Sequence, residues 1–258
     1  MRLTIIGCGA MGSALAKNLA KNTLVLVDRD FKSTSAFAKE IGATATKDLS
    51  QAVAKADAVL IAVKPYHLEE LARQLSPLLK SGTIVISVLA GVRLADLKRH
   101  FPKQPLLSIM PNIAVAYGKG VIGIVESPDL TPELRKVAKN LFADSGLLIF
   151  LPEAKIDALA ALGGSAPAFA LHLMESMTDG GVLLGFPARQ ALDITIEVFE
   201  GAIALLKESK ELPQALKWQV TSPGGTTIEG IKVLEQERVH YALMQALLAT
   251  HQKAQKLS

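Results

Sequence analysis

Three glycines near the start of the chain constrain its fold most strongly. Gly7, Gly9 and Gly12 have the spacing G-x-G-x-x-G, and they lie between the apolar run LTII (3–6) and the stretch SALAKNLA (13–20). Between a strand and a helix, this spacing is the fingerprint of a dinucleotide-binding βαβ unit. The first glycine permits a tight turn, the second lets the backbone approach a pyrophosphate, and the third allows close helix–strand packing. The alternative is a glycine turn that serves packing alone.

The same turn indicates how a dinucleotide would be held. Ala10 and Met11 lie at the start of the expected helix, where free backbone amides attract phosphate. The second expected strand ends at Asp28, about 20 residues after the first glycine, where an acid usually binds the ribose diol of NAD and repels the 2′-phosphate of NADP. Arg29 follows at once and is able to bind that phosphate. The sequence therefore leaves NADP and NAD both open.

Residues 1–151 alternate short apolar runs with stretches of helical spacing. Continuous apolar strands between helices are typical of a parallel sheet that is covered on both faces. We therefore predict a Rossmann-like, doubly wound α/β domain over residues 1–151. Its expected strands are 3–6, 24–27, 58–63, 83–88, 106–110, 121–125 and 147–151. A helix is expected to begin at Pro132, with Thr131 as its N-cap.

The carboxyl ends of parallel strands form the ligand crevice of such a sheet. The strand over 58–63 ends in Ala62, Val63 and Lys64. Lys64 is a candidate for contact with a cofactor phosphate or an anionic substrate, and the alternative is an ordinary surface lysine. Asn112 follows a later strand and is a candidate for contact with the nicotinamide region, with a turn residue as the alternative.

Residues 152–258 have almost no strand signal. The segment 165–185 is apolar and poor in charge, and a helix that is apolar on most sides must be covered on most sides. We therefore predict an all-α domain over 152–258 that forms the interface of a homodimer with intertwined helices. Packing onto the first domain of the same chain is the alternative. The expected helices are 153–162, 165–184, 188–209, 212–220 and 226–256.

Composition argues against several classes of function. The chain has 28 basic and 24 acidic residues with no dense basic run, so we expect no nucleic-acid partner. The single cysteine, Cys8, excludes an intrachain disulfide and is typical of a reducing compartment. No signal peptide and no membrane span are expected, which predicts a cytoplasmic protein. The five histidines lack the spacing of metal ligands, so no metal is expected and a nicotinamide would carry any redox chemistry.

Six segments occur in a particular order along the whole chain. They are GCGAMG, AVKP, SVLAGV, MPN, ALGGSAPAF and VTSPGGTT. With these segments the chain resembles the pyrroline-5-carboxylate reductase family, and the last three carry most of the specificity. The resemblance implies a Rossmann domain followed by a helical dimerisation domain, with larger assemblies of dimers in the family. It also implies hydride transfer from NADPH or NADH to the C=N bond of 1-pyrroline-5-carboxylate, which gives L-proline in the last step of proline biosynthesis.

The resemblance also assigns roles in the loop at 222–227. It implies that this loop holds the substrate carboxylate, with the Thr227 hydroxyl on the ring nitrogen and Ser222 beside the carboxylate. If the helical halves interlock, the loop would complete a site on the partner subunit. The substrate-binding residues implied are Ser165, Pro167, Ser222, Gly224, Gly225, Thr226 and Thr227.

The residues of this loop support an anion site independently. Gly224 and Gly225 can present backbone N–H groups without side-chain obstruction, and a helix start adds positive dipole. Thr226 and Glu229 have the spacing of a capping box, which predicts Thr226 as the N-cap of the last helix. The alternative is a plain turn between two helices.

The chain departs from the family pattern near the expected nicotinamide and substrate. Ile113 and Ala114 replace Thr and Pro after MPN, Ser108 replaces a basic residue, and Gly163 and Ala166 replace Ser and Gly. These departures leave open a related reductase of another cyclic imine acid, such as a six-membered one. A non-enzymatic dinucleotide-binding regulator is a further alternative.

Overall fold

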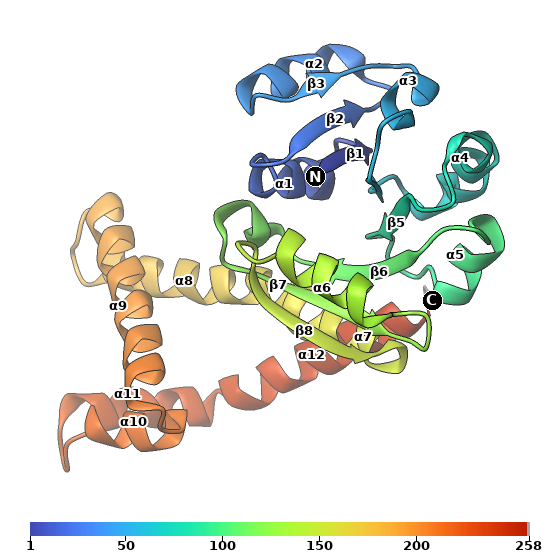
Figure 1. The fold of residues 1–258 in the computed structure, drawn as a ribbon. Coiled ribbons are helices and arrows are strands. Elements are labelled where there is room, and N and C mark those ends of the chain that lie inside the picture. The colour runs from blue at the N-terminus through green and yellow to red at the C-terminus, as the bar shows by residue number, and fades with distance from the viewer. Residues whose placement is uncertain (257–258) are drawn as a thin grey trace. The chain divides into compact units, whose positions relative to one another are not determined.

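A computed structural model describes residues 1–256, and the contacts divide the chain into two compact units (Figure 1). The first unit comprises residues 1–165 and the end of the chain from Thr250, and the second comprises residues 166–249. The helical turns that follow the last strand contact the sheet and are counted with the first unit for that reason. The predicted domain boundary between residues 151 and 152 stays a prediction.

The described part of the first unit contains an eight-stranded sheet in the order β3-β2-β1-β4-β5-β6-β7-β8. The first six strands in this order, from β3 through β2, β1, β4 and β5 to β6, are parallel to one another. Strand β7 is antiparallel to β6, and β8 is parallel to β7. The strands are β1 (Arg2–Ile6), β2 (Thr23–Val27), β3 (Thr44–Ala45), β4 (Ala58–Ile61), β5 (Ile84–Ser87), β6 (Leu106–Pro111), β7 (Gly120–Glu126) and β8 (Gly146–Pro152).

The predicted doubly wound fold is confirmed, but the expectation of an entirely parallel sheet is wrong at one pair of strands. Only the loop 112–119 connects β6 to β7, and it contains the short 3₁₀ segment η3 (Ile113–Tyr117). A parallel pair needs a crossover of about a dozen residues or more, so this connection returns the chain antiparallel. The two-residue strand β3 was not predicted, because Thr44–Ala45 is too short to show a pattern.

Helices cover both faces of the sheet, as the continuous apolar strands indicate. Along β4, Ala58 and Leu60 pack into one buried cluster and Val59 and Ile61 into the other, so successive side chains are buried on opposite faces. The helices of this unit are α1 (Ala10–Asn18), α2 (Phe31–Glu40), α3 (Leu49–Val53), η1 (Pro65–His67), α4 (Leu68–Leu75), η2 (Ser76–Leu78), α5 (Leu94–His100), α6 (Pro132–Leu141), η4 (Glu153–Lys155), α7 (Ile156–Leu159) and the π-helical turn η5 (Ala160–Ser165).

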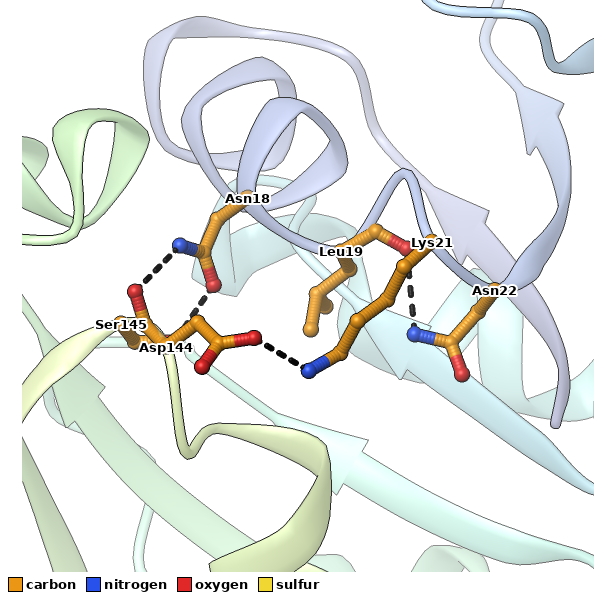
Figure 2. A network of polar contacts seen from close by, with 6 residues as sticks. All are labelled: Asn18, Leu19, Lys21, Asn22, Asp144 and Ser145. Atoms are coloured by element: carbon orange, nitrogen blue, oxygen red, sulfur yellow. Dashed lines mark hydrogen bonds and ion pairs between the residues drawn. The ribbon is translucent and has the colours of Figure 1, made fainter.

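Polar contacts fix the start of α6 and the end of α1 in this unit. The predicted N-cap of α6 is confirmed, because the Thr131 hydroxyl accepts a hydrogen bond from the backbone N–H of Leu134 at 3.2 Å. Figure 2 shows the carboxyl-terminal end of α1. There the Asn18 side-chain N–H donates to the Asp144 carbonyl oxygen, and the Asn18 side-chain oxygen accepts the Ser145 hydroxyl. Lys21 forms an ion pair with the Asp144 carboxylate. These contacts anchor the helix that follows the glycine-rich turn at its far end.

The second unit is entirely helical within the described residues. Its helices are α8 (Ala166–Leu183), α9 (Ala188–Ser209), α10 (Pro213–Gln219), α11 (Thr226–Gln236) and α12 (Val239–Gln255), the last of which ends in the first unit. The single helix predicted over 226–256 is wrong, because the chain breaks between α11 and α12. Arg238 there has a left-handed backbone with φ of 56°, although no glycine or proline marks the position.

Large apolar side chains are exposed throughout the second unit. Leu183 is 89% exposed, and Leu171, Trp218 and Tyr241 are more than half exposed. The helical run Glu153–Leu183 is also long and apolar enough to cross a membrane by length and composition alone. Only 11% of its apolar window is buried. Apolar surface on this scale marks an interaction face.

Candidate active site

In the glycine-rich turn between β1 and α1, two glycines have no room for a side chain and the third has free space beside it. Gly7 has φ of +98°, and an added Cβ there would lie 2.6 Å from the Ala62 backbone. A Cβ at Gly12 would lie 1.9 Å from the Gly7 carbonyl oxygen, whereas a Cβ at Gly9 would meet nothing within 4 Å. The main chain thus packs against Gly7 and Gly12 and leaves space at Gly9, where a dinucleotide pyrophosphate approaches.

A cavity of about 790 Å³ lies along this turn and the adjoining strand ends. Its volume is within the range of small-molecule and cofactor sites, so it fits a nicotinamide dinucleotide. Gly12 and Asn112 are the predicted cofactor residues that do not line it. Those that do are Gly7, Gly9, Ala10, Met11, Asp28, Arg29, Ala62, Val63 and Lys64. Their contact with a cofactor stays a prediction.

Asp28, at the end of β2, holds the glycine-rich turn. Its Oδ2 accepts the backbone N–H of Cys8 at 2.6 Å, and its Oδ1 accepts the backbone N–H of Asp30 at 3.0 Å. Burial, and secondarily the Asp28 charge, raises the pKa of the Cys8 thiol to about 11. The thiol is therefore protonated at neutral pH and is not a nucleophile there.

Asn112 has a structural role that the sequence did not reveal. Its side chain is 6% exposed. Its Nδ2 donates to the Gly163 carbonyl oxygen at 2.7 Å, and its Oδ1 accepts the backbone N–H of Val121 at 3.2 Å. The side chain therefore ties the end of β6 to β7 and to the π-helical turn η5. The predicted contact of Asn112 with the nicotinamide stays a prediction.

We expect Asn112→Asp to lower the free energy of unfolding by about 1–3 kcal/mol. The substitution removes the donor to Gly163 and turns a carboxylate oxygen toward its carbonyl oxygen in a buried place. Urea denaturation measures the change. The exposed Asn140 on α6 offers a matched control, since Asn140→Asp makes the same chemical change outside the core. Equal effects at the two positions would contradict the structural role of Asn112.

The N-cap of α11 differs from the predicted one. Gly225 is the N-cap of α11, no side chain caps the helix, and Thr226 is its first residue. The predicted capping box is therefore wrong, and Glu229 pairs with Lys232 at 3.4 Å instead. Gly224 has φ of +68° and thereby completes a turn in which the Gly225 N–H donates to the Ser222 carbonyl oxygen at 3.1 Å. That turn leaves Thr226 already inside the helix.

Comparison with known proteins covers the whole chain. A family model for pyrroline-5-carboxylate reductase dimerisation matches residues 153–257, and a model for NADP oxidoreductase, coenzyme F420-dependent, matches residues 2–91. Pyrroline-5-carboxylate reductase of Aquifex aeolicus is 36% identical over 100% of this chain and 97% of its own. The chain belongs to the pyrroline-5-carboxylate reductase family. It is an NAD(P)H-dependent oxidoreductase, which removes the alternative of a non-enzymatic regulator.

Other members of the family agree in sequence and in structure. The Escherichia coli reductase is 30% identical over 100% of this chain and 98% of its own length. A solved pyrroline-5-carboxylate reductase from Streptococcus pyogenes covers 99% of this chain at 27% identity with a TM-score of 0.90, and 98% of that chain is covered. The Coxiella burnetii reductase covers 99% of this chain at 29% identity with a TM-score of 0.85, and 98% of that chain is covered. These likenesses extend through both units.

Sequence reasoning missed several residues that line the cavity of this reductase. His67 lies three residues after Lys64, and Lys47 follows β3. The position of His67 two residues after the AVKP segment was the available signal. Within residues 1–256, no three His, Cys, Asp or Glu side chains are grouped so that they could hold a metal ion.

The remaining predicted residues are distributed over both units. Ser165 ends the turn η5 in the first unit. Pro167 lies in α8, and the loop from Ser222 to Thr227 precedes and begins α11, all in the second unit. The roles of these residues in substrate binding stay predictions.

Proposed function

We propose that this protein reduces the C=N bond of 1-pyrroline-5-carboxylate with NADPH or NADH and releases L-proline. The observation that carries the proposal is the 36% identity to a pyrroline-5-carboxylate reductase over the full chain. The open position at Gly9 and the cavity of about 790 Å³ beside it support the cofactor half of the reaction. Proline biosynthesis in the cytoplasm is the corresponding physiological role.

The reaction demands little acid–base chemistry from the protein. Reduction adds a hydride to the imine carbon and leaves the ring nitrogen with a proton, and the reduced nicotinamide supplies the hydride when it is bound. An imine nitrogen is more basic than a carbonyl oxygen, so the substrate is able to bind already protonated. The residues of the chain then act mainly by holding the reactants close and in the correct orientation.

The start of α1 would hold the cofactor phosphates. Its N-cap is Gly9, and no side chain caps this helix start. Backbone N–H groups at a helix start and the positive end of the helix dipole both favour a phosphate. Ala10 and Met11 form the first turn there and line the cavity.

The start of α11 would hold the substrate carboxylate for the same reason. The helix is 11 residues long, its N-cap Gly225 has no side chain, and the first turn carries the hydroxyl of Thr227. We assign the Thr227 hydroxyl to the ring nitrogen of the substrate and the Ser222 hydroxyl to its carboxylate. Each hydrogen bond to a charged group contributes about 1.5–3 kcal/mol.

Gly225→Ala tests the assignment of Ser222. An added Cβ would lie 2.3 Å from the Ser222 Oγ and would displace that hydroxyl. The extended N-cap backbone with φ of −80° suits alanine, and the added Cβ would also lie 3.2 Å from the Ser222 carbonyl oxygen. We expect kcat/KM for the imine to fall about tenfold or more, with a loss of stability below about 1 kcal/mol because alanine is a poorer N-cap than glycine. Gly230→Ala in the same helix meets nothing within 4 Å and is the control. Unaltered kinetics in Gly225→Ala would remove Ser222 from the site.

The exposed apolar helices support a homodimer. The family model for dimerisation covers residues 153–257, which include the apolar run 153–183. We therefore assign the exposed apolar surface to a second copy of the chain rather than to a membrane. Sedimentation velocity of the purified protein tests this, because a monomer that stays in solution without detergent would contradict it.

A spectrophotometric assay at 340 nm tests the proposed reaction. Purified protein is mixed with NADPH or with NADH, and DL-pyrroline-5-carboxylate is added. Oxidation that depends on the imine supports the proposal, and the ratio of rates gives the cofactor preference. Oxidation with a six-membered cyclic imine acid but not with pyrroline-5-carboxylate would instead favour the related reductase, to which the exposed Ile113 and its neighbour Ala114 point.

A further inference from the structure

Two carboxylates from the segment after β8 hold the turn 88–93, which joins β5 to α5. The Arg93 Nη2 donates to the Asp157 Oδ2 at 2.8 Å, and the Glu153 Oε1 accepts the backbone N–H of Leu94 at 2.6 Å. Arg93 is the N-cap of α5, and its own side chain does not cap the helix. The first N–H groups of a helix have no partner within it, so Glu153 supplies one from 59 positions along the chain.

The ion pair between Arg93 and Asp157 is largely shielded from water. The side chain of Asp157 is 12% exposed and that of Arg93 is 34% exposed. By contrast, Arg99 on the same helix pairs with Asp96 while its side chain is exposed. Water and salt screen exposed pairs much more strongly than shielded ones. The pair at Arg93 is therefore able to fix the two segments that it joins, whereas the pair at Arg99 contributes little.

The ion pair lies at a small cavity where several elements meet. The cavity has a volume of about 20 Å³ and is lined by the turn 88–93 and by residues of β6, β7 and α7. Such a volume holds about one water molecule, so this place is a packing junction and not a ligand site. Of the described residues that line it, Arg93 alone is basic, against the acids Glu153 and Asp157. Because Ser108 also lines it in place of a basic residue, Arg93 brings the charge that balances these acids.

The turn 88–93 also reaches the cofactor cavity, which Val88, Leu89 and Ala90 line. In the sheet, β5 lies on the other side of β1 from β2. The adenosine ribose of a dinucleotide is expected at the end of β2, so this turn lies toward the nicotinamide half. From Asp157 the chain continues through η5 to Ser165, a proposed substrate residue. The ion pair therefore links the expected place of the hydride donor to that of its acceptor.

We infer that Arg93 is a positioning residue for hydride transfer. Its ion pair with Asp157 fixes the turn 88–93 against the segment 153–165, and thereby sets how close the nicotinamide comes to the imine carbon. A displacement of about 1 Å in such a site costs up to about a hundredfold in rate. Arg93 does not line the cofactor cavity, so its loss should change the rate much more than the binding of cofactor. The inference rests on the proposed function for the imine and the hydride.

Single-turnover kinetics and NADPH titration separate the rate from binding. Excess enzyme is mixed with NADPH and saturating pyrroline-5-carboxylate, the decay at 340 nm gives the rate of hydride transfer, and fluorescence titration gives the Kd. We expect Arg93→Ala to slow hydride transfer about tenfold or more and to change the Kd for NADPH less than about threefold. Arg93→Lys keeps a positively charged donor and should recover part of the lost rate. Arg99→Ala removes the same charge from the exposed pair and should alter neither quantity.

A double-mutant cycle tests the ion pair itself. Asp157→Asn removes the charge of the other partner and should also slow hydride transfer about tenfold or more. If both side chains act through one contact, the double variant Arg93→Ala/Asp157→Asn should be no slower than the slower single variant. Losses that multiply in the double variant would show independent roles and would overturn the inference. It would also fail if Arg93→Ala transferred hydride like the wild type, or if its Kd for NADPH rose as much as its rate fell.

Amide hydrogen exchange, read by mass spectrometry, tests the same contact without the imine. Arg93→Ala and Asp157→Asn should speed exchange in the peptide that covers 88–97 about fivefold or more, whereas Arg99→Ala should not. Unchanged exchange in the first two variants would overturn the inference even if turnover fell. A wild-type enzyme that bound NADPH but did not oxidise it with pyrroline-5-carboxylate would refute the proposed function. The exchange result would then still decide whether the ion pair fixes the turn.

Discussion

Gly12→Ala is expected to cost about 3 kcal/mol of folding free energy and to abolish dinucleotide binding, whereas Gly9→Ala should weaken binding about tenfold or more with little loss of stability. A Cβ at Gly12 would lie 1.9 Å from the Gly7 carbonyl oxygen, which is backbone and has no room to retreat. A Cβ at Gly9 meets nothing, and its backbone with φ of −69° and ψ of −168° suits alanine. The Cβ of Gly9→Ala would project into the space that the pyrophosphate needs.

Urea denaturation and titration with NADPH fluorescence measure the two effects separately. For Gly9→Ala we expect a change in stability below about 1 kcal/mol and a Kd for NADPH raised at least tenfold, which corresponds to about 1.4 kcal/mol. Gly82→Ala, in the loop before β5, also meets nothing within 4 Å and should alter neither quantity. NADPH binding that survives Gly9→Ala would place the pyrophosphate elsewhere on the chain.

The contrast between these two glycines shows what the sequence made predictable. The spacing of Gly7, Gly9 and Gly12 predicts the shape of the turn directly. Each position needs a glycine for its own steric reason, and these reasons hold in any chain with a strand before and a helix after the turn. The strands of the sheet were equally predictable from the sequence, because burial on both faces requires a continuous apolar run. Such features depend on neighbours close in sequence or on composition alone.

Features that depend on distant partners were missed or misjudged. Asn112 finds its acceptor at Gly163, 51 positions further along the chain, and no local pattern reveals that contact. Asp28 accepts the backbone N–H of Cys8, 20 positions earlier, which the sequence does not reveal, and its contact with the cofactor stays a prediction. The capping box at Thr226 failed for a local reason, since the left-handed Gly224 made Gly225 the N-cap. The break between α11 and α12 at residues 237–238 could not be predicted, because no glycine or proline occurs there.

The second large effect is expected at Thr227, the hydroxyl assigned to the substrate nitrogen. Thr227→Ala should lower kcat/KM for the imine about 10- to 100-fold, since a hydrogen bond to a charged group contributes about 1.5–3 kcal/mol. The Kd for NADPH, measured by fluorescence titration, should not change, because the cavity that holds the cofactor residues does not include Thr227. Comparison of the two quantities therefore separates loss of the substrate contact from general damage to the enzyme.

Two neighbouring substitutions make this result specific to the hydroxyl of Thr227. Thr227→Ser keeps the hydroxyl and should retain most of the turnover, whereas Thr226→Ala removes an adjacent hydroxyl that is not assigned to the ring nitrogen and should lower kcat/KM less than Thr227→Ala does. Because both threonines lie in the first turn of α11, the two alanine variants make the same change in helix propensity at the same end of the helix. If Thr227→Ala turned over like the wild type, the substrate nitrogen would have another partner, and the start of α11 would keep only its role as a carboxylate site.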